Sequence, residues 1–347
     1  MEVPQIAELK TVDELESALS EPYPEDVAFV EREIDDDVLV LGAGGKMGPT
    51  LTRRLVLALR ATGKNHRVFA VSRYSNAQAR DSIAAAGAHP IASDLLDAES
   101  LRNLPSCSII YYLVGTKFGT TGNEPLTWAV NSHLPGRIAR RWPNARIVAL
   151  STGNVYSLSP GSSNGPTEED PVGPVGEYAQ SCLGRERVFT YFSVRRKTPM
   201  ALIRLNYAVE ARYGVLLDIA ANVWQGRPVS VAMGQVNLIW QGDANSYILR
   251  SLPLCSAPPR ILNVTGTEKR SVRGLAERFG KLLNREVTIE DEEGDTALIS
   301  DATLCRRLLG PPKVQIEDVI SLVSRWVAEG RPVLGRPTHF DVRDGAF

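Results

Sequence analysis

The feature that most constrains this chain is a short apolar run followed by evenly spaced glycines, at residues 38–48. The run, residues 38–41, is apolar throughout, as in strands that are buried on both faces of a parallel sheet. Glycines with the spacing GxxGxxG follow it and lead into a predicted helix over residues 47–61. The first glycine of such a turn permits the tight bend, the second lets the backbone approach a pyrophosphate, and the third lets helix and strand pack closely. The pattern predicts a dinucleotide site formed by Gly42, Gly45, Lys46, Met47 and Gly48.

Strands and helices alternate after this turn. Alternation of this kind produces right-handed βαβ units and a parallel sheet. We therefore predict an α/β fold, with a doubly wound parallel sheet of the Rossmann type and a smaller C-terminal α/β lobe for the substrate. Further buried strands are expected at residues 67–72, 89–92, 108–114, 146–150 and 200–205, and helices at 77–86, 126–142 and 178–193.

The chain divides into four predicted parts. Residues 1–35 form an N-terminal extension, expected to be a short helix and an extended arm because Pro22 and Pro24 interrupt the helical pattern. Residues 36–206 form the dinucleotide-binding domain. Residues 207–330 form mainly the substrate lobe, interleaved with the first domain, and residues 331–347 form a tail.

Composition argues against several classes of protein. Lys plus Arg total 39 against 40 Asp plus Glu, so no charge excess points to a nucleic acid or an anionic membrane as partner. The first 35 residues lack the pattern of a secretory signal, and no apolar run has the length of a membrane span. The four cysteines and four histidines are scattered, without the spacing of a metal site. We expect a cytoplasmic protein that binds a small-molecule substrate and no metal.

The end of the second predicted strand bears on which dinucleotide is bound. An acidic residue there accepts hydrogen bonds from the ribose 2′-hydroxyl of NAD, whereas an arginine accommodates the 2′-phosphate of NADP. This chain has Ser72 and Arg73, which favours NADP over NAD. After the third strand, Asp94 and Leu95 are expected at the cofactor's adenine end. A helix cap is the alternative role for Asp94, although Asp97 fits that role better.

The order of these motifs resembles the extended short-chain dehydrogenase/reductase family, also called the NAD-dependent epimerase/dehydratase family. The resemblance covers roughly residues 37–330 and includes Gly115 after a strand, together with segments 151–156, 177–181 and 203–207. It implies hydride transfer between a nicotinamide cofactor and a hydroxylated substrate. It also implies a homodimer formed through the helix at residues 178–193.

The resemblance assigns catalytic roles to Thr152 and Tyr178. In the family, a hydroxyl at the position of Thr152 hydrogen-bonds the reacting oxygen, and the tyrosine of a YxxxK motif exchanges the proton. The lysine of that motif lowers the pKa of the phenol, which is about 10 when unperturbed, and holds the nicotinamide ribose. In this chain the lysine position is Cys182, and a neutral thiol serves neither purpose well.

Three interpretations of this substitution remain open. Lys117, in the loop after a predicted strand, supplies the missing cation; Tyr178 acts as a neutral hydrogen-bond donor; or the chain binds cofactor without turnover. Arg185 is a less favoured cation, because it lies three residues beyond Cys182 and is expected on another side of the helix.

The leading functional interpretation is an NAD(P)-dependent oxidoreductase or epimerase that acts on a sugar or another hydroxylated small molecule. The alternatives are a cofactor-binding regulatory or sensor protein that has lost catalysis, and a lyase or dehydratase that uses bound NAD and a different base. Gly115 is expected at the cofactor, and Phe118, Asn154 and Asn206 at the substrate.

Overall fold

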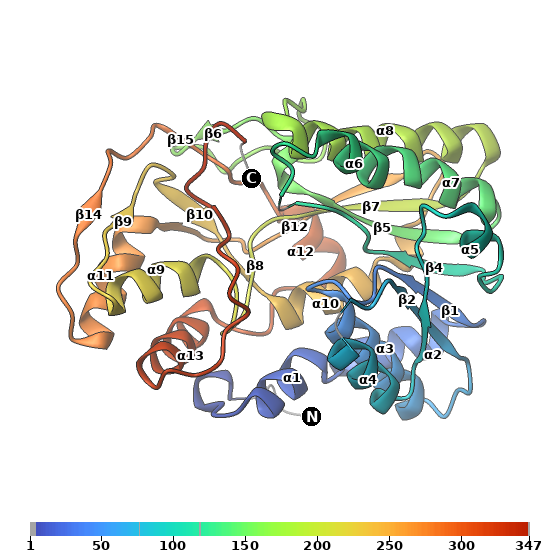
Figure 1. The fold of residues 1–347 in the computed structure, drawn as a ribbon, viewed down its shortest axis with the longest axis horizontal. Coiled ribbons are helices and arrows are strands. Elements are labelled where there is room, and N and C mark those ends of the chain that lie inside the picture. The colour runs from blue at the N-terminus through green and yellow to red at the C-terminus, as the bar shows by residue number, and fades with distance from the viewer. Residues whose placement is uncertain (1–4, 76, 118, 346–347) are drawn as a thin grey trace.

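A computed structural model gives the fold of the protein and describes residues 5–75, 77–117 and 119–345. Two lobes lie side by side along the longest axis (Figure 1). One lobe is built on a large sheet, and the other on helices and short strand pairs. The C-terminal tail runs between the two lobes in this view, so it faces the region where they meet.

A seven-stranded parallel sheet forms the centre of the larger lobe. Its order is β12-β7-β5-β4-β1-β2-β3, so the chain steps outward from β1 in both directions, and the predicted doubly wound fold is confirmed. Val38 pairs with Val68 on one side and with Ile109 on the other, which brings the carboxyl ends of these strands to one edge. The strands are β1 (Val38–Leu41), β2 (Val68–Ser72), β3 (His89–Ala92), β4 (Ile109–Tyr112), β5 (Arg146–Thr152), β7 (Met200–Leu205) and β12 (Arg260–Val264).

Helices cover both faces of this sheet because successive residues of a strand point to opposite sides. Val38 and Val40 share a buried cluster with Leu51, whereas Leu39 shares one with Phe189. The first cluster is covered by α2 (Pro24–Glu33), α3 (Gly48–Ala61), α4 (Ala77–Ala86), α10 (Gln241–Arg250) and α12 (Thr303–Leu309). The second is covered by α5 (Ala98–Arg102), α7 (Leu134–Arg141) and α8 (Gly176–Arg196).

The segment between β4 and β5 is a continuous helix with a π-helical turn in its middle. It consists of α6 (Glu124–Trp128), the π-helical turn η2 (Ala129–His133) and α7. Turns of this kind frequently lie at functional sites. Here the turn carries Asn131, whose side chain is fully buried.

The smaller lobe has a separate apolar core. Its helices are α1 (Val12–Ser20), α9 (Val215–Trp224), α11 (Val272–Leu283) and α13 (Ile316–Ala328). Pairs of short strands complete it: β10 (Gln235–Asn237) with β13 (Lys269–Ser271), β9 (Val229–Ser230) with β14 (Ile289–Glu290), β8 (Ala208–Val209) with β11 (Ile239–Trp240), and β6 (Ser159–Pro160) with β15 (Thr296–Ala297). The described residues also form three 3₁₀ turns: η1 (Ile6–Glu8) packs against α13, whereas η3 (Gly153–Val155), which follows β5, and η4 (Leu252–Leu254), which packs against β5 and β7, belong to the larger lobe. Between these elements the chain returns to the large sheet through α10 and β12.

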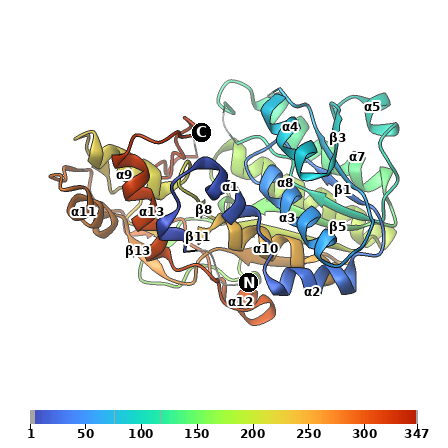
Figure 2. The ribbon, with the colours of Figure 1, turned by 90° about the horizontal axis from the view of Figure 1, so that it is seen from below.

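The N-terminal extension differs from the extended arm predicted after its first helix. Pro24 is the first residue of α2, where a missing N–H and a fixed φ favour a helix start. Asp26 of this helix forms a fully buried ion pair with Arg54 of α3, at 2.5 Å, and accepts a hydrogen bond from Ser246 of α10. The extension therefore packs along the larger lobe as a second helix (Figure 2).

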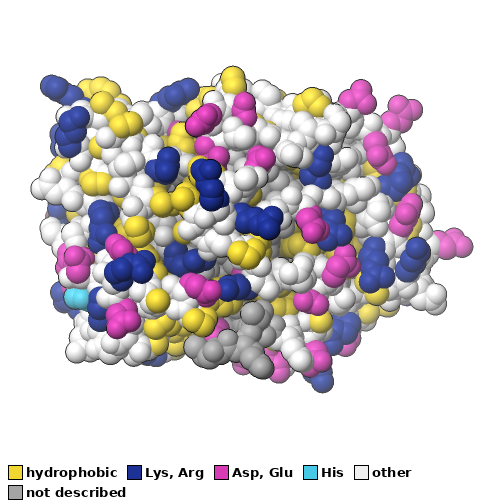
Figure 3. All heavy atoms as spheres, turned by 180° about the vertical axis from the view of Figure 1, so that it is seen from behind, with side chains coloured by type: hydrophobic (Ala, Val, Ile, Leu, Met, Phe, Trp, Pro, Cys, Tyr) yellow, Lys and Arg dark blue, Asp and Glu magenta, His cyan; other side chains and the backbone are white. Residues whose placement is uncertain are grey.

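None of the helices in the described part of the chain combines the length and apolarity needed to cross a membrane. The described residues also contain no group of three His, Cys, Asp or Glu side chains placed to hold a metal ion. On the face opposite to that of Figure 1, basic and acidic side chains are interspersed (Figure 3).

Candidate functional site

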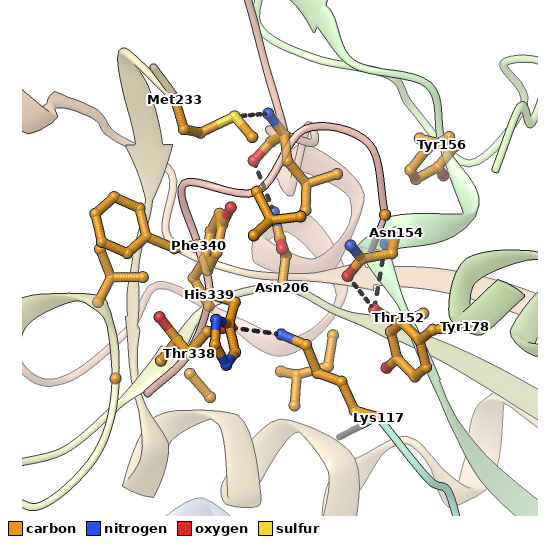
Figure 4. Close-up of a pocket in the computed structure, with 18 of the residues that line it drawn as sticks. Lys117, Thr152, Asn154, Tyr156, Tyr178, Asn206, Met233, Thr338, His339 and Phe340 are labelled. Atoms are coloured by element: carbon orange, nitrogen blue, oxygen red, sulfur yellow. Dashed lines mark hydrogen bonds between the residues drawn. The ribbon is translucent and has the colours of Figure 1, made fainter. Parts of the chain in front are cut away.

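A pocket of about 210 Å³ lies where the two lobes meet. Thr152 lies at the end of β5, Asn206 follows β7, Lys46 follows β1 and Lys117 follows β4, and all four line the pocket. Figure 4 shows Thr152, Asn206 and Lys117 around it. Parallel α/β sheets bind ligands at the carboxyl ends of their strands. The pocket therefore lies where such a fold places a ligand.

The glycine turn is shaped by close approaches of the backbone. Gly42 has φ +87°, and a Cβ there would lie 2.9 Å from the carbonyl carbon of Leu113. A Cβ on Gly48, the first residue of α3, would lie 2.3 Å from the carbonyl oxygen of Ala43. Gly45 is exposed, and a Cβ there would meet only a turn oxygen, at 3.3 Å. These residues fit a pyrophosphate at the N-terminus of α3, where N–H groups and the helix dipole attract anions.

The other predicted cofactor residues lie along the same sheet edge. Ser72 ends β2, and the side chain of Arg73 after it is exposed. Asp94 follows β3 and accepts a hydrogen bond from the N–H of Leu96, whereas Asp97 caps α5 through the N–H of Ser100. Leu95 between them is buried, and Met47 is buried at the N-terminus of α3.

Lys46 extends from the glycine turn toward the smaller lobe. Its Nζ donates a hydrogen bond to the carbonyl of Ala208, at 2.8 Å, and lies 4.1 Å from the ring centre of Tyr213. Burial lowers the pKa of Lys46 to about 7, although the nearby carboxylate of Glu210 favours the charged form. The ammonium therefore lies in a desolvated position close to the predicted pyrophosphate site.

Tyr178 and Thr152 lie together on one wall of the pocket (Figure 4). The Thr152 hydroxyl donates to Oδ1 of Asn154, at 2.9 Å, and the side chain of Tyr178 is hydrogen-bonded to those of Thr152 and Cys182. Burial raises the pKa of Tyr178 well above its usual value of 10, and the Cys182 thiol adds to this effect. Arg185 and Thr152 act in the opposite direction without offsetting it. The phenol consequently stays protonated near neutral pH.

Lys117 approaches the pocket from the loop after β4. Its Nζ donates to the carbonyl of Thr338, at 3.1 Å, and its side chain extends below Tyr178 in Figure 4. Burial lowers the pKa of Lys117 to about 8, whereas Asp218 and Cys182 favour its charged form. Below that pH the pocket thus contains an ammonium group close to the tyrosine.

Arg185 lies elsewhere than expected, and the reason is helical geometry. Positions 178, 182 and 185 of α8 are separated by four and three residues, so they share one face of the helix. The Arg185 side chain is buried along this face, and its charge acts on both Tyr178 and Cys182. Nη1 donates to the carbonyl of Leu150, at 2.7 Å, and Nη2 to Oδ1 of Asn131, at 2.8 Å. The spacing of Tyr178, Cys182 and Arg185 in the sequence was the signal that a buried cation other than Lys117 lies near Tyr178.

This arginine also fixes the loop that carries Lys117. A Cβ on Gly115 would lie 2.8 Å from Nη2 of Arg185, so only glycine permits this approach without a shift. Asn131 accepts from the N–H of Thr116 and donates to its carbonyl, at 2.9 and 3.0 Å. Arg185 and Asn131 therefore hold the backbone at Gly115 and Thr116, immediately before Lys117.

The predicted substrate residues differ in their surroundings. Asn154 faces the pocket beside Thr152, as described above. Asn206 lines it too, but its amide donates to the carbonyl of Leu298, at 3.2 Å, so this group also joins the strands of the two lobes. Phe118 lies outside the described residues.

The tail supplies pocket residues that sequence reasoning missed. Thr338, His339 and Phe340 line the pocket opposite Tyr178 (Figure 4). The proline and glycine residues of the tail leave no periodic pattern from which a structural role could be predicted. The only sequence features that suggested a place in the pocket were His339 and Phe340.

Comparison with known proteins identifies a family and several similar solved structures. The model of the NAD dependent epimerase/dehydratase family matches residues 38–229. A search of curated proteins finds no match. Similar solved structures include Pal from Bacillus thuringiensis, with 19% identity, a TM-score of 0.71, and coverage of 85% of this chain and 100% of that one. The UDP-Glc/GlcNAc 4-epimerase of Campylobacter jejuni has 18% identity and a TM-score of 0.70, covering 85% and 99%. The dTDP-glucose 4,6-dehydratase of Bacillus anthracis, in complex with NAD, has 16% identity and a TM-score of 0.69, covering 85% and 97%.

Proposed function

Because this chain belongs to the NAD-dependent epimerase/dehydratase family, we propose that it is an NAD(P)-dependent oxidoreductase or epimerase acting on a sugar or another hydroxylated small molecule. The observation that carries this proposal is the convergence of Thr152, Tyr178 and Lys117 on one pocket beside the glycine turn. Similarity to enzymes of UDP- and dTDP-linked sugars supports a polyhydroxylated substrate.

The glycine turn, with Lys46 and Met47, holds the cofactor's pyrophosphate in this proposal, and Gly115 lies at its nicotinamide half. NADP is favoured because Arg73 is exposed at the end of β2, where it can reach a 2′-phosphate. When bound in its reduced form, the nicotinamide supplies the hydride.

The protonated state of Tyr178 favours the reductive direction. As the carbonyl carbon of the substrate gains a hydride, its oxygen gains negative charge and needs a proton. Tyr178 donates that proton and regains one from solvent, while Thr152 hydrogen-bonds the same oxygen. The ammonium of Lys117 stabilises the developing charge, so it replaces the lysine that is absent at position 182.

The proposal is tested by following the absorbance of reduced nicotinamide with purified protein over a panel of sugars, polyols and their oxidised forms. Tyr178→Phe should lower kcat by about 10²–10⁴-fold and leave the cofactor Kd unchanged. Tyr247→Phe is the matched control, because Tyr247 lies in α10 and does not line the pocket. Tight cofactor binding without turnover on any substrate would instead support a regulatory protein.

We also propose that the enzyme is a cytoplasmic homodimer formed through α8. Tyr191 and Val194 of this helix are 62% and 49% exposed, and Trp128 of α6 is 38% exposed. Large exposed apolar side chains on neighbouring helices are typical of interaction surfaces. Light scattering should give a dimer mass that Val194→Glu reduces to that of a monomer, whereas Val333→Glu, in the tail, should leave it unchanged.

A further inference from the structure

The ammonium of Lys117 lies at the tip of a long side chain that extends from a loop. Arg185 and Asn131 hold the backbone at the start of this loop, as described above. At the tip, Nζ of Lys117 donates to the carbonyl of Thr338 in the C-terminal tail, at 3.1 Å (Figure 4). A lysine side chain loses much rotamer freedom when it keeps one orientation, so a fixed acceptor at its tip favours that orientation. The tail therefore helps to place the ammonium in the pocket.

Thr338 is held in turn by a carboxylate of the smaller lobe. Its N–H and its hydroxyl both donate to Oδ2 of Asp218, at 2.8 and 2.5 Å. Asp218 lies in the first turn of α9, where the positive end of the helix dipole favours a carboxylate. Thr338 is buried, so water competes little for these hydrogen bonds. The contacts form a chain from α9 through the tail to the ammonium of Lys117.

The residues that follow Thr338 give the tail a defined course. Phe340 packs into the apolar core of the smaller lobe. Nη1 of Arg343 donates to the carbonyls of Ala232 and Thr296, at 2.9 and 2.6 Å. Hydrogen bonds from a charged donor are stronger than those between neutral groups. The carbonyl that Lys117 contacts thus belongs to a segment that is anchored beyond this point as well.

Asp218 also acts on the charge of Lys117. Burial lowers the pKa of Lys117 to about 8, and Asp218 opposes this effect more strongly than the thiol of Cys182 does. The neighbouring Lys46 is affected by both groups, since Asp218 raises its pKa and Lys117 lowers it. Burial and Asp218 raise the pKa of Tyr213 to about 12, so this phenol stays neutral. The carboxylate therefore increases the fraction of the protein in which Lys117 carries its charge.

Other charged groups of the tail lie near Asp218. Burial raises the pKa of Asp218, and the two hydrogen bonds from the tail oppose this effect. Asp341 raises that pKa further, whereas His339 lowers it. Asp341 is not among the described residues that line the pocket, nor among the groups that shift the pKa of Lys117. Asp344, near the end of the tail, is exposed. Asp218 is thus the carboxylate that acts on Lys117.

We propose that Asp218 and Thr338 are positioning residues for Lys117: Thr338 holds the ammonium through its carbonyl, and Asp218 fixes Thr338 and supplies the opposing negative charge. This inference rests on the proposed function, in which Lys117 stabilises the charge that develops on the reacting oxygen. Both residues act through Lys117 and not on the substrate itself. The C-terminal tail is therefore a working part of the site.

Asp218→Asn separates the charge of this residue from its hydrogen bonds. The side-chain oxygen of asparagine still accepts from Thr338, whereas the negative charge is lost. Loss of an opposite charge lowers the pKa of a lysine, so kcat/KM for carbonyl reduction should begin to fall at about pH 7 instead of about pH 8. Asp341→Asn is the matched control, because it removes a carboxylate of the same tail and should leave the profile unchanged.

The ionisation of Lys117 is also measured without turnover. The pH profile alone does not separate Lys117 from Lys46, on which Asp218 acts as well. Nuclear magnetic resonance of protein with isotope-labelled lysine Cε follows each lysine through its titration, and Lys117→Arg identifies the signal of Lys117. Its midpoint should lie at about pH 8 in the wild type and at about pH 7 in Asp218→Asn.

Thr338→Val tests the hydrogen-bonded chain while the charge of Asp218 is kept. The variant loses one of the two hydrogen bonds to the carboxylate. Its kcat/KM at pH 7 should fall by about tenfold, with the wild-type pH profile. Thr338→Ser keeps the hydroxyl and should restore the wild-type rate. This pair also tests the inference if circular dichroism shows that Asp218→Asn does not fold.

The outcomes distinguish this inference from the proposed function. A wild type without turnover on any substrate contradicts the proposed function, whereas a lower Lys117 midpoint in Asp218→Asn still supports the pairing of the two residues. Equal Lys117 midpoints in the wild type and Asp218→Asn overturn the role of Asp218, and so does an equally large change in Asp341→Asn. A Thr338→Val variant with the wild-type kcat/KM overturns the role of Thr338.

Discussion

Replacing Lys117 tests whether its positive charge has taken over from the lysine missing at position 182. Burial lowers the pKa of Lys117 from 10.5 to about 8. At about 1.4 kcal/mol per pH unit, this difference corresponds to roughly 3 kcal/mol of preference for the neutral amine. Hence about nine-tenths of the free enzyme carries the ammonium at pH 7 and about one-tenth at pH 9.

The expected result is a value of kcat/KM for carbonyl reduction that falls about tenfold per pH unit above pH 8, since kcat/KM reports ionisations of the free enzyme. Lys117→Arg should remove this decrease, because a guanidinium stays charged throughout the range. Lys117→Met should lower kcat/KM at pH 7 by about 10²-fold or more. Lys46 has a pKa of about 7, which the positive charge at position 117 helps to lower. Lys117→Arg keeps that charge, so the comparison of this variant with the wild type isolates the titration of Lys117.

The assay is the initial rate of reduced-nicotinamide consumption between pH 6 and 10, with cofactor affinity measured separately by fluorescence. Lys281→Met, at an exposed position of α11, is the control and should keep the wild-type profile. Activity that rises through pH 8 and is lost in Lys117→Met would mean that the neutral amine is the active form. A Lys117→Met variant with the wild-type rate and profile would refute the role altogether.

Three further predictions concern stability, cofactor choice and the substituted motif. Asp26→Asn should destabilise the protein by about 3–5 kcal/mol in denaturant unfolding, because it leaves the buried charge of Arg54 unpaired; Asp81→Asn, in an exposed pair with Arg80, should change stability by less than about 1 kcal/mol. Arg73→Ala should weaken NADP binding by about tenfold or more while NAD binding stays the same, and an equal loss for both cofactors in fluorescence titration would contradict the assignment of the 2′-phosphate. Cys182→Lys should lower both stability and activity, because it buries a second cation beside Arg185. Combination with Arg185→Met should recover part of the stability in a double-mutant cycle, and simple additivity would show that the two positions are independent.

Six of the seven strands of the large sheet were predictable because their sequence signals are local. An apolar run such as Val38–Leu41 is long enough to identify a buried strand, and the glycine turn identifies the helix that follows. The edge strand β12 was missed for a related reason. It carries Asn263, a polar residue that is fully buried because it accepts from the hydroxyl of Tyr156 and donates to the carbonyl of Pro166. A contact between residues more than a hundred positions apart leaves no local periodicity.

Some residues of the pocket have a local signal in the sequence, whereas others are placed there only by contacts with distant residues. Thr152 and Tyr178 belong to motifs with recognisable spacing, and Lys117 follows a predicted strand end. The tail residues that face them are defined by partners such as Asp218, which lies 120 positions from Thr338. Only the fold brings these segments together, so the wall of the pocket could not be predicted from the sequence.

The substitution at position 182 is best understood together with Arg185. In a buried site with low dielectric, two adjacent cations repel strongly, and each also loses its hydration. The guanidinium of Arg185 is fixed by hydrogen bonds to the carbonyl of Leu150 and the side chain of Asn131. Positions 182 and 185 share one face of α8, so a lysine at position 182 would lie against this guanidinium. A neutral thiol avoids that repulsion, and the ammonium of Lys117 reaches the pocket from the loop that Arg185 and Asn131 hold in place. On this reasoning Cys182 is one part of a rearranged set of charges, and restoring the lysine alone cannot restore the arrangement of the family.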